Sequence, residues 1–142
     1  MKKLYEHALE DFGLAEVPGS GTNARITKAI SEAAEWLEKD DSVTAWCGCI
    51  MGLWFKEIGL AGLRPKAWYR AANWATVGKE VKLSEARVGD VVVMGRKGGK
   101  HVTLFSKLKG EMVYCLGGNQ NNQVNVSAYN KDLIETIRRI EA

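Results

Sequence analysis

The sequence predicts a single α+β domain. A length of 142 residues suits one domain better than two. Hydrophobic residues make up 46% and charged residues 26%, a balance typical of soluble globular proteins and too apolar for disorder. Helical periodicity dominates up to about residue 76, and alternating apolar segments with turns follow from about residue 80. Helices followed by antiparallel strands indicate an α+β domain over residues 1–142, with a helical part of about 1–76 and a sheet part of about 80–142.

Two amphipathic helices are expected first. Apolar residues at helical spacing predict a helix over residues 4–12 that ends at Gly13. After a loop, Asn23 is placed to cap a second helix, because its side-chain oxygen can accept an unpaired backbone N–H. An apolar stripe over residues 26–37 forms the buried face of that helix.

The third helix is expected at the centre of the domain. Residues 45–58 are apolar on almost every side, which favours a buried helix. Ser42 or Thr44 could cap its start, and Gly59 could end it. A short fourth helix is predicted over residues 66–75.

The second half predicts antiparallel strands. Residues 88–94 form one strand entered by a turn, and residues 101–108 and 111–116 form a hairpin. Residues 117–122 are polar and glycine-rich, which indicates a loop. A final strand is expected over residues 134–140.

Charge and hydropathy exclude several classes of protein. The formal net charge of +3 comes without the clustered Lys and Arg typical of nucleic-acid binding. No run of 18 apolar residues is present, so we expect no integral membrane segment. The N-terminal residues lack the apolar core of a secretory signal, so we expect synthesis in a cytoplasm without a Sec signal. Three cysteines in a chain that can build its own core suggest free thiols.

The scarce Cys and His residues suggest thiol chemistry. Cys47 lies near the start of the central helix, where unpaired N–H groups and the helix dipole lower a thiol pKa. His101 opens a strand after a glycine-rich loop, and Asn119 follows the next strand. Because a hairpin brings these two strand ends together, we expect Asn119 near His101. The three residues could form a nucleophile, a general base and a group that orients the base.

Each of these candidate residues could also have a purely structural role. A cysteine on an apolar helix is usually a small buried hydrophobe, which is our interpretation of Cys49 and Cys115. A histidine at a strand start is more often a surface residue, and Gly117-Gly118-Asn119 could be an ordinary turn. Three Cys and two His fall short of a typical four-ligand zinc site, so no metal or cofactor is expected.

Five segments together resemble one group of enzymes, the phage-encoded CHAP-like and NlpC/P60-like cell-wall hydrolases. The stretch TAWCGCI around Cys47 is similar to their nucleophile segment. Four other segments resemble theirs and follow in the same order: PGSGTNARI (18–26), VGDVVV (88–93), KHVTLF (100–105) and LGGNQNNQVNVS (116–127). The resemblance therefore extends over most of the chain.

The resemblance implies a papain-like fold of the NlpC/P60 and CHAP type, in which the nucleophile begins a central helix packed on a small antiparallel sheet. It also implies hydrolysis of an amide bond in peptidoglycan. By position, Cys47 is the nucleophile, His101 the general base and Asn119 the orienting group. Gln120 is a neighbour of the triad or a substrate contact.

We also expect aromatic side chains to line a substrate cleft. Trp46, Trp68 and Trp74 are the residues predicted for this role. The expected partner is the peptidoglycan stem peptide, whose free carboxylates suit a mildly basic domain.

The resemblance also suggests a biological setting. Trp46 stands where many NlpC/P60 enzymes have Asp, which favours the CHAP-like phage group. A phage endolysin or tail-associated lysin is therefore expected, reaching the periplasm and cell wall through a holin or as part of a virion with phage tail proteins. Two alternatives are an interbacterial toxin amidase paired with an immunity protein and a non-catalytic papain-like binding domain in a phage particle.

Overall fold

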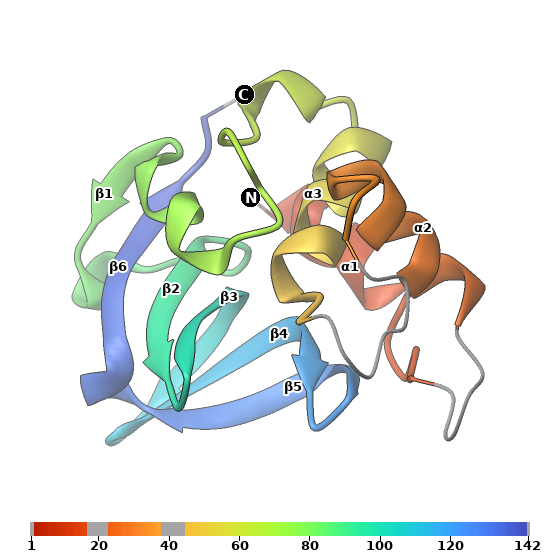
Figure 1. Cartoon of the computed structure of the whole chain (residues 1–142). Helices are drawn as coiled ribbons and strands as arrows, with labels where there is room; N and C mark the ends of the chain where they lie inside the picture. The colour runs from red at the N-terminus through yellow and green to blue at the C-terminus, as the bar shows by residue number, and fades with distance from the viewer. Residues whose placement is uncertain (1, 17–22, 38–44, 142) are drawn as a thin grey trace.

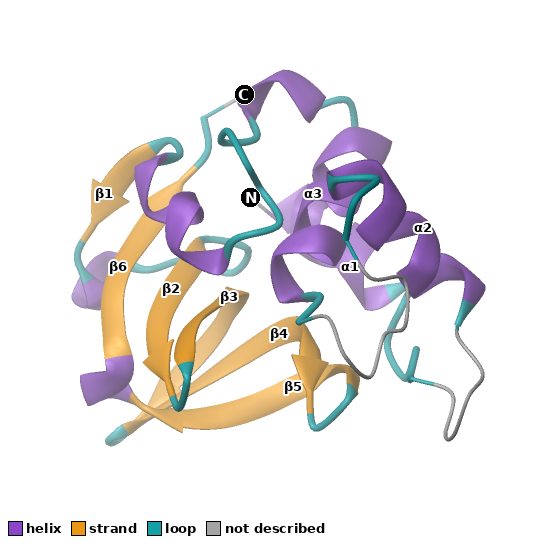
Figure 2. Ribbon diagram, in the orientation of Figure 1, coloured by secondary structure: helices purple, strands orange, loops and turns teal. Residues whose placement is uncertain are grey.

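The computed structural model describes residues 2–16, 23–37 and 45–141. Three α-helices gather on one side of a six-stranded sheet (Figure 1). The strand order is β1-β6-β2-β3-β4-β5, and each neighbouring pair is antiparallel. Figure 2 separates the mostly helical first half from the strand-rich second half. The predicted α+β class is therefore confirmed.

The first two helices lie near their predicted positions. Helix α1 spans Lys2–Leu9 and α2 spans Ala24–Ala33. The Asn23 cap is confirmed, since its side-chain oxygen accepts N–H bonds from Arg25 and Ile26 at 2.9 and 3.2 Å. In the described part of the chain, no helix is long and apolar enough to cross a membrane.

Helix α3 spans Cys47–Glu57 and is the central helix that its composition predicts. Nine of its eleven residues are buried. The expected caps Ser42 and Thr44 lie outside the described residues, and Trp46 precedes the helix without capping it through its side chain. The chain leaves the helix through Gly59, whose φ of +84° suits a residue without Cβ.

The predicted helix over 66–75 is wrong. This stretch contains turns, followed by the 3₁₀ helix η2 at Ala71–Thr76. The Asn73 side-chain amide donates to the backbone carbonyls of Lys66 and Ala67 at 3.0 and 3.1 Å. Ala67 adopts a φ of +49°. These local bonds compete with helical ones, which is why the apolar spacing did not produce an α-helix.

Four of the six strands were expected, with somewhat different ends. The strands are β1 Lys79–Val81, β2 Val91–Arg96, β3 Gly99–Lys109, β4 Met112–Gln120, β5 Gln123–Asn130 and β6 Ile134–Arg139. Strands β1 and β5 were not predicted. The expected loop over 117–122 is mostly the end of β4, and Asn121 and Asn122 form the tight turn into β5. Both have positive φ, which Asn tolerates better than most residues.

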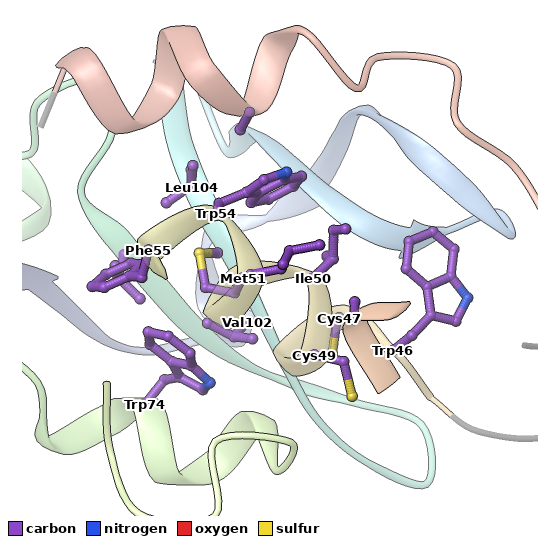
Figure 3. Close-up of a cluster of buried hydrophobic side chains, with 14 of the residues drawn as sticks. Trp46, Cys47, Cys49, Ile50, Met51, Trp54, Phe55, Trp74, Val102 and Leu104 are labelled. Carbon is purple, nitrogen blue, oxygen red and sulfur yellow. The ribbon is translucent and has the colours of Figure 1, made fainter. Parts of the chain in front are cut away.

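Two apolar clusters cover opposite faces of the sheet. The larger one fills the space between the helices and the sheet, with α3 at its centre (Figure 3). Its sheet members include Val91, Val93, Val102, Leu104 and Leu116. The second cluster comprises Val92, Met94, Phe105, Val113, Cys115 and Ile137. Since side chains alternate along a strand, His101 and Thr103 on β3 point to the second face.

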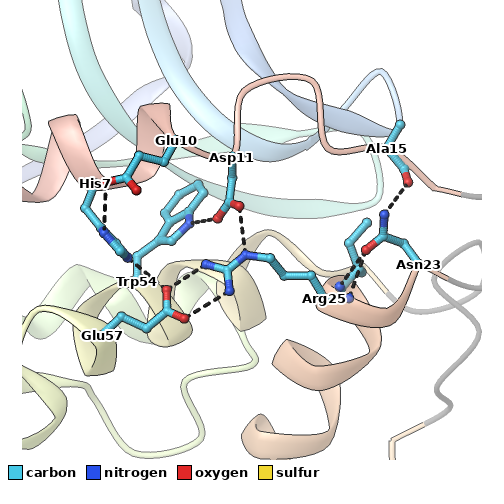
Figure 4. Close-up of polar contacts among 9 residues, drawn as sticks. His7, Glu10, Asp11, Ala15, Asn23, Arg25, Trp54 and Glu57 are labelled. Carbon is cyan, nitrogen blue, oxygen red and sulfur yellow. Dashed lines mark hydrogen bonds and ion pairs between the residues drawn. The ribbon is translucent and has the colours of Figure 1, made fainter.

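A polar network fixes α3 against α2 and the turn after α1 (Figure 4). The Arg25 guanidinium donates two hydrogen bonds to Glu57, at 2.9 and 2.6 Å, and one to Asp11 at 2.7 Å. Asp11 also accepts the indole N–H of Trp54 at 2.8 Å. The bonds from Arg25 lower the pKa of Glu57 to about 2. The position of α3, and thus of Cys47, is set by these bonds as well as by apolar packing.

Candidate active site

Cys47 is the first residue of α3 and is almost fully buried, with 3% of its surface exposed. Burial raises the pKa of its thiol. The backbone N–H of Val102, the positive charge of Arg96 and the N–H groups of Gly48 and Cys47 lower it, but they do not offset burial. The thiol is therefore protonated at neutral pH in this structure.

His101 lies on β3 and is fully buried, and three side chains surround its ring. Its Nε2 is 2.9 Å from Gln120 Oε1 and 3.3 Å from the Tyr129 hydroxyl. Its Nδ1 is 3.1 Å from Arg96 Nη1. Both ring nitrogens thus have partners, and the imidazole has a defined orientation.

The surroundings of Gln120 determine which nitrogen of His101 carries the proton. Gln120 Nε2 contacts the backbone carbonyls of Cys115 at 3.1 Å and Asn125 at 2.7 Å. These oxygens can only accept, so the amide must turn its Oε1 toward His101. There Oε1 accepts from the Thr103 hydroxyl at 2.9 Å and from His101 Nε2. Nδ1 of the neutral ring is then the unprotonated nitrogen, and it accepts from Arg96.

The imidazole is uncharged at neutral pH. Burial lowers the pKa of His101 to about 4, and the charge of Arg96 lowers it as well, whereas the bond to Gln120 opposes the shift. Burial also raises the pKa of Tyr129 to about 12. The neutral imidazole therefore lies between the guanidinium of Arg96 and the neutral phenol of Tyr129.

Gln120, and not Asn119, makes the side-chain contact with His101. Asn119 has a φ of +57° and offers its backbone carbonyl to Arg96 Nη1 at 3.0 Å. The pairing of β4 with β5 shifts register between Gly117 and Gln120. This irregularity brings Gln120 to the ring. Strand alternation cannot locate such a shift, so the sequence predicted Asn119 beside the ring where the structure has the side chain of Gln120.

Trp46 and Trp74, predicted to line a cleft, are both fully buried in the core. The Trp46 indole N–H donates to Glu16 at 3.0 Å, and Trp74 packs edge-on against Phe55. The structure thus places both indoles away from any surface that a substrate could contact. These large apolar rings stabilise the fold more by burial than they could by lining an open cleft.

Trp68, the third predicted cleft residue, is half-buried against α3. Its ring lies where a Cβ on Gly52 would stand. The guanidinium of Arg64 covers the ring at 4.6 Å from the centroid. Contacts within the protein therefore occupy much of the Trp68 ring.

Among the described residues, Cys47 and His101 are not hydrogen-bonded to each other. The thiol meets the N–H of Val102, the residue after His101, while His101 Nδ1 accepts from Arg96. Among the described residues, no pocket opens onto the Cys47 thiol or the His101 ring. The described residues contain no group of three or more His, Cys, Asp or Glu side chains that could hold a metal ion.

Two residues of this site were not assigned a catalytic-site role from the sequence. Tyr129 lies on β5, a strand that was not expected, and so its contact with the imidazole had no sequence signal. Arg96 is the last residue of β2. Its guanidinium reaches His101 across the β2–β3 turn only because of the direction of its side chain, which the sequence does not give.

Solved structures share this fold, although the sequence matches no protein-family model and no curated protein. The peptidoglycan hydrolase RipB from Mycobacterium tuberculosis has a TM-score of 0.58 at 20% identity, over 99% of this chain and 67% of RipB. The P60 domain of an antigen from M. avium subspecies paratuberculosis has a TM-score of 0.56 at 19% identity, over 98% and 96%. A mutated form of RipA, a protein that interacts with a resuscitation-promoting factor, has a TM-score of 0.58 at 15% identity.

The structural match covers 98% of this chain but only 62% of the RipA chain. These likenesses confirm the papain-like α+β fold of the NlpC/P60 type. A P60 domain among them favours the NlpC/P60 side of the sequence resemblance over its CHAP-like, phage-type side.

Proposed function

We propose that this protein is a cysteine-dependent peptidoglycan hydrolase that cleaves an amide bond. Two kinds of observation support the proposal. The fold is shared with RipB, which is a peptidoglycan hydrolase. In addition, the thiol of Cys47 at a helix start contacts the backbone N–H of Val102, the residue after His101, whose tautomer is defined. A thiol and an imidazole are the parts that nucleophilic catalysis requires.

The observation that carries the proposal is the bond from His101 Nε2 to Gln120 Oε1. It leaves the lone pair of the imidazole on Nδ1, the nitrogen that would take the proton of Cys47. We therefore give Gln120 the orienting role that the sequence suggested for Asn119. An amide oxygen holds the ring and also stabilises the imidazolium that forms during the reaction.

The reaction would proceed by acyl transfer. Cys47 Sγ attacks the carbonyl carbon of the amide as its proton passes to His101 Nδ1, and the imidazolium then protonates the leaving amine. Water attacks the resulting thioester as it gives a proton to His101, and His101 then returns this proton to Sγ as the acid leaves. The backbone N–H of Cys47, at the unpaired start of α3, would stabilise the oxyanion.

The test is digestion of purified peptidoglycan, with the fragments identified by mass spectrometry. The wild-type protein should release fragments, whereas Cys47→Ala should lower the rate by at least about 10³-fold. New lactyl groups would indicate cleavage of the muramoyl–L-alanine bond. New amino termini within the stem would indicate an endopeptidase.

Cys49→Ala is the matched control, because Cys49 is a buried thiol two residues along the same helix. Burial raises its pKa to about 12, which suits a core residue and not a nucleophile. This variant should retain most of the activity. No fragments from the wild type would refute the hydrolase proposal and favour a non-catalytic binding domain. Release of fragments at the same rate by the wild type and Cys47→Ala would refute the proposed role of Cys47.

The biological setting proposed from the sequence is a phage endolysin or a tail-associated lysin. An interbacterial toxin of the same fold is the alternative. A toxin would be neutralised by an immunity protein encoded beside it. Co-expression with the products of adjacent genes distinguishes the two, because rescue of growth by a neighbour would contradict the phage assignment.

A further inference from the structure

Arg96 is a cation without an acidic partner in the described chain. It ends β2 and is half-buried. Its Nη1 donates to His101 Nδ1 at 3.1 Å and to the Asn119 carbonyl at 3.0 Å. Among the described residues, no carboxylate lies within ion-pair distance of Arg96, and its Nε and Nη2 make no hydrogen bond. Three N–H donors of the guanidinium thus have no hydrogen-bond acceptor among the described residues.

Such an environment is unfavourable for a guanidinium unless a ligand completes it. A partly desolvated charge is stabilised by an opposite charge, and the planar edge formed by Nε and Nη2 matches the two oxygens of a carboxylate. Two arginines of the described chain have such partners, whereas the half-buried Arg64 and Arg138 donate to backbone carbonyls. Arg25 pairs with Asp11 and Glu57, and Arg139 pairs with Asp90.

The position of Arg96 also has a consequence for the base. In the neutral imidazole, Nδ1 has one lone pair in the ring plane, and Arg96 Nη1 occupies it. Cys47 cannot transfer its proton to Nδ1 while that bond stands. For the reaction proposed above, this arrangement would be a resting state, and catalysis would require Nη1 to move away from the ring.

We propose that Arg96 is the binding site for a free carboxylate of the substrate, and that this carboxylate draws Nη1 away from His101 Nδ1. The inference rests on the function proposed above and specifies its substrate. The protein would prefer a peptide with a free carboxylate beside the amide that is cleaved. Substrate binding would then free the base for Cys47.

A binding experiment tests the preference without relying on hydrolysis. Two stem peptides, identical except for a terminal carboxylate or carboxamide, are titrated by calorimetry into the full chain with Cys47→Ala. The carboxylate form should bind about 10- to 100-fold more tightly. Adding Arg96→Gln should abolish this difference. Lys97→Gln removes an equal charge from an exposed neighbour, and this control should keep most of the difference.

A spectroscopic readout tests the release of the base. With ¹⁵N-labelled histidine, the Nδ1 resonance of His101 should move on addition of the carboxylate peptide, because the bond from Arg96 is lost. The carboxamide peptide should not reproduce this change. In Arg96→Gln, the resonance should begin near its ligand-bound position and respond equally to both peptides.

Three results would overturn the inference: equal affinity for the two peptides, a difference that survives Arg96→Gln, or no binding of either peptide. Each could occur while the wild-type protein still hydrolyses peptidoglycan. Conversely, a preference that depends on Arg96 in a protein that releases no fragments would support carboxylate binding and refute the hydrolase function. The two proposals can therefore fail separately.

Discussion

At the scale of single residues, Gln120 decides the chemistry that His101 can perform. Its amide nitrogen meets backbone carbonyls, and its oxygen accepts from Thr103 and His101. A buried amide with all of these partners cannot rotate without losing several hydrogen bonds at once. The protonation pattern of the imidazole is therefore a consequence of the strand register around Gln120.

Replacing Gln120 should therefore affect activity far more than replacing Asn119. Gln120→Ala removes the acceptor for His101 Nε2 and should lower kcat/KM by about 10²-fold or more. Asn119→Gly is the matched variant, because it keeps the backbone carbonyl and suits the φ of +57°. It should stay within about threefold of the wild type, since general-base catalysis is left intact. Thermal unfolding of both variants checks that they fold, and the opposite ranking of activities would restore Asn119 as the orienting residue.

At the scale of elements, α3 depends on two glycines on one of its faces. Gly48 and Gly52 are four residues apart, so they lie one above the other on the helix. A Cβ on Gly48 would stand 2.6 Å from the Trp68 carbonyl oxygen, and one on Gly52 would stand 2.0 Å from the Trp68 ring. The missing side chains allow the segment around Trp68 to cross the start of α3 next to Cys47.

Gly52→Ala should accordingly destabilise the protein, although alanine normally favours a helix. The expected loss is about 1–3 kcal/mol of unfolding free energy, because the added methyl displaces the Trp68 ring. Gly62→Ala is the control, since a Cβ there meets open space, and it should change stability by less than about 1 kcal/mol. Denaturant unfolding measures both. Equal stability of the two variants would show that α3 and Trp68 do not pack as described.

The elements differ in how far the sequence could predict them. The apolar periodicity of α3 and the Asn23 cap are local signals, and the structure confirms both. Strand β5 was missed although Val124, Val126 and Ala128 alternate with polar residues. The asparagine-rich segment before it was interpreted as a loop, and two of these asparagines form the turn into the strand. The contact between Gln120 and His101 depends on a register shift, which a single sequence does not reveal.

At the scale of the whole molecule, the stability of the fold is coupled to the protonation of its site. His101 has a pKa of about 4 in the folded protein and about 6.5 when unfolded. Between these values the unfolded chain binds more protons, so stability rises with pH. Glu57, with a folded pKa of about 2, adds a dependence of the same sign at lower pH.

Unfolding free energy should therefore fall as the pH drops from about 6.5 to 4. The contribution of His101 to this fall is about 3 kcal/mol. His101→Gln lacks the titrating ring, and its stability should be flatter over this interval. Urea unfolding at a series of pH values makes the comparison. Parallel curves for the two proteins would mean that the imidazole is not held neutral in the fold.

The place of β6 in the sheet bears on how the protein is made. This strand follows all others in the sequence, yet it lies between β1 and β2. During synthesis, β1 has no neighbour in the sheet until residues 134–139 have left the ribosome. Because such distant pairings must wait, folding is expected to be slow. Unpaired strand edges in the emerging chain are exposed to aggregation in the meantime.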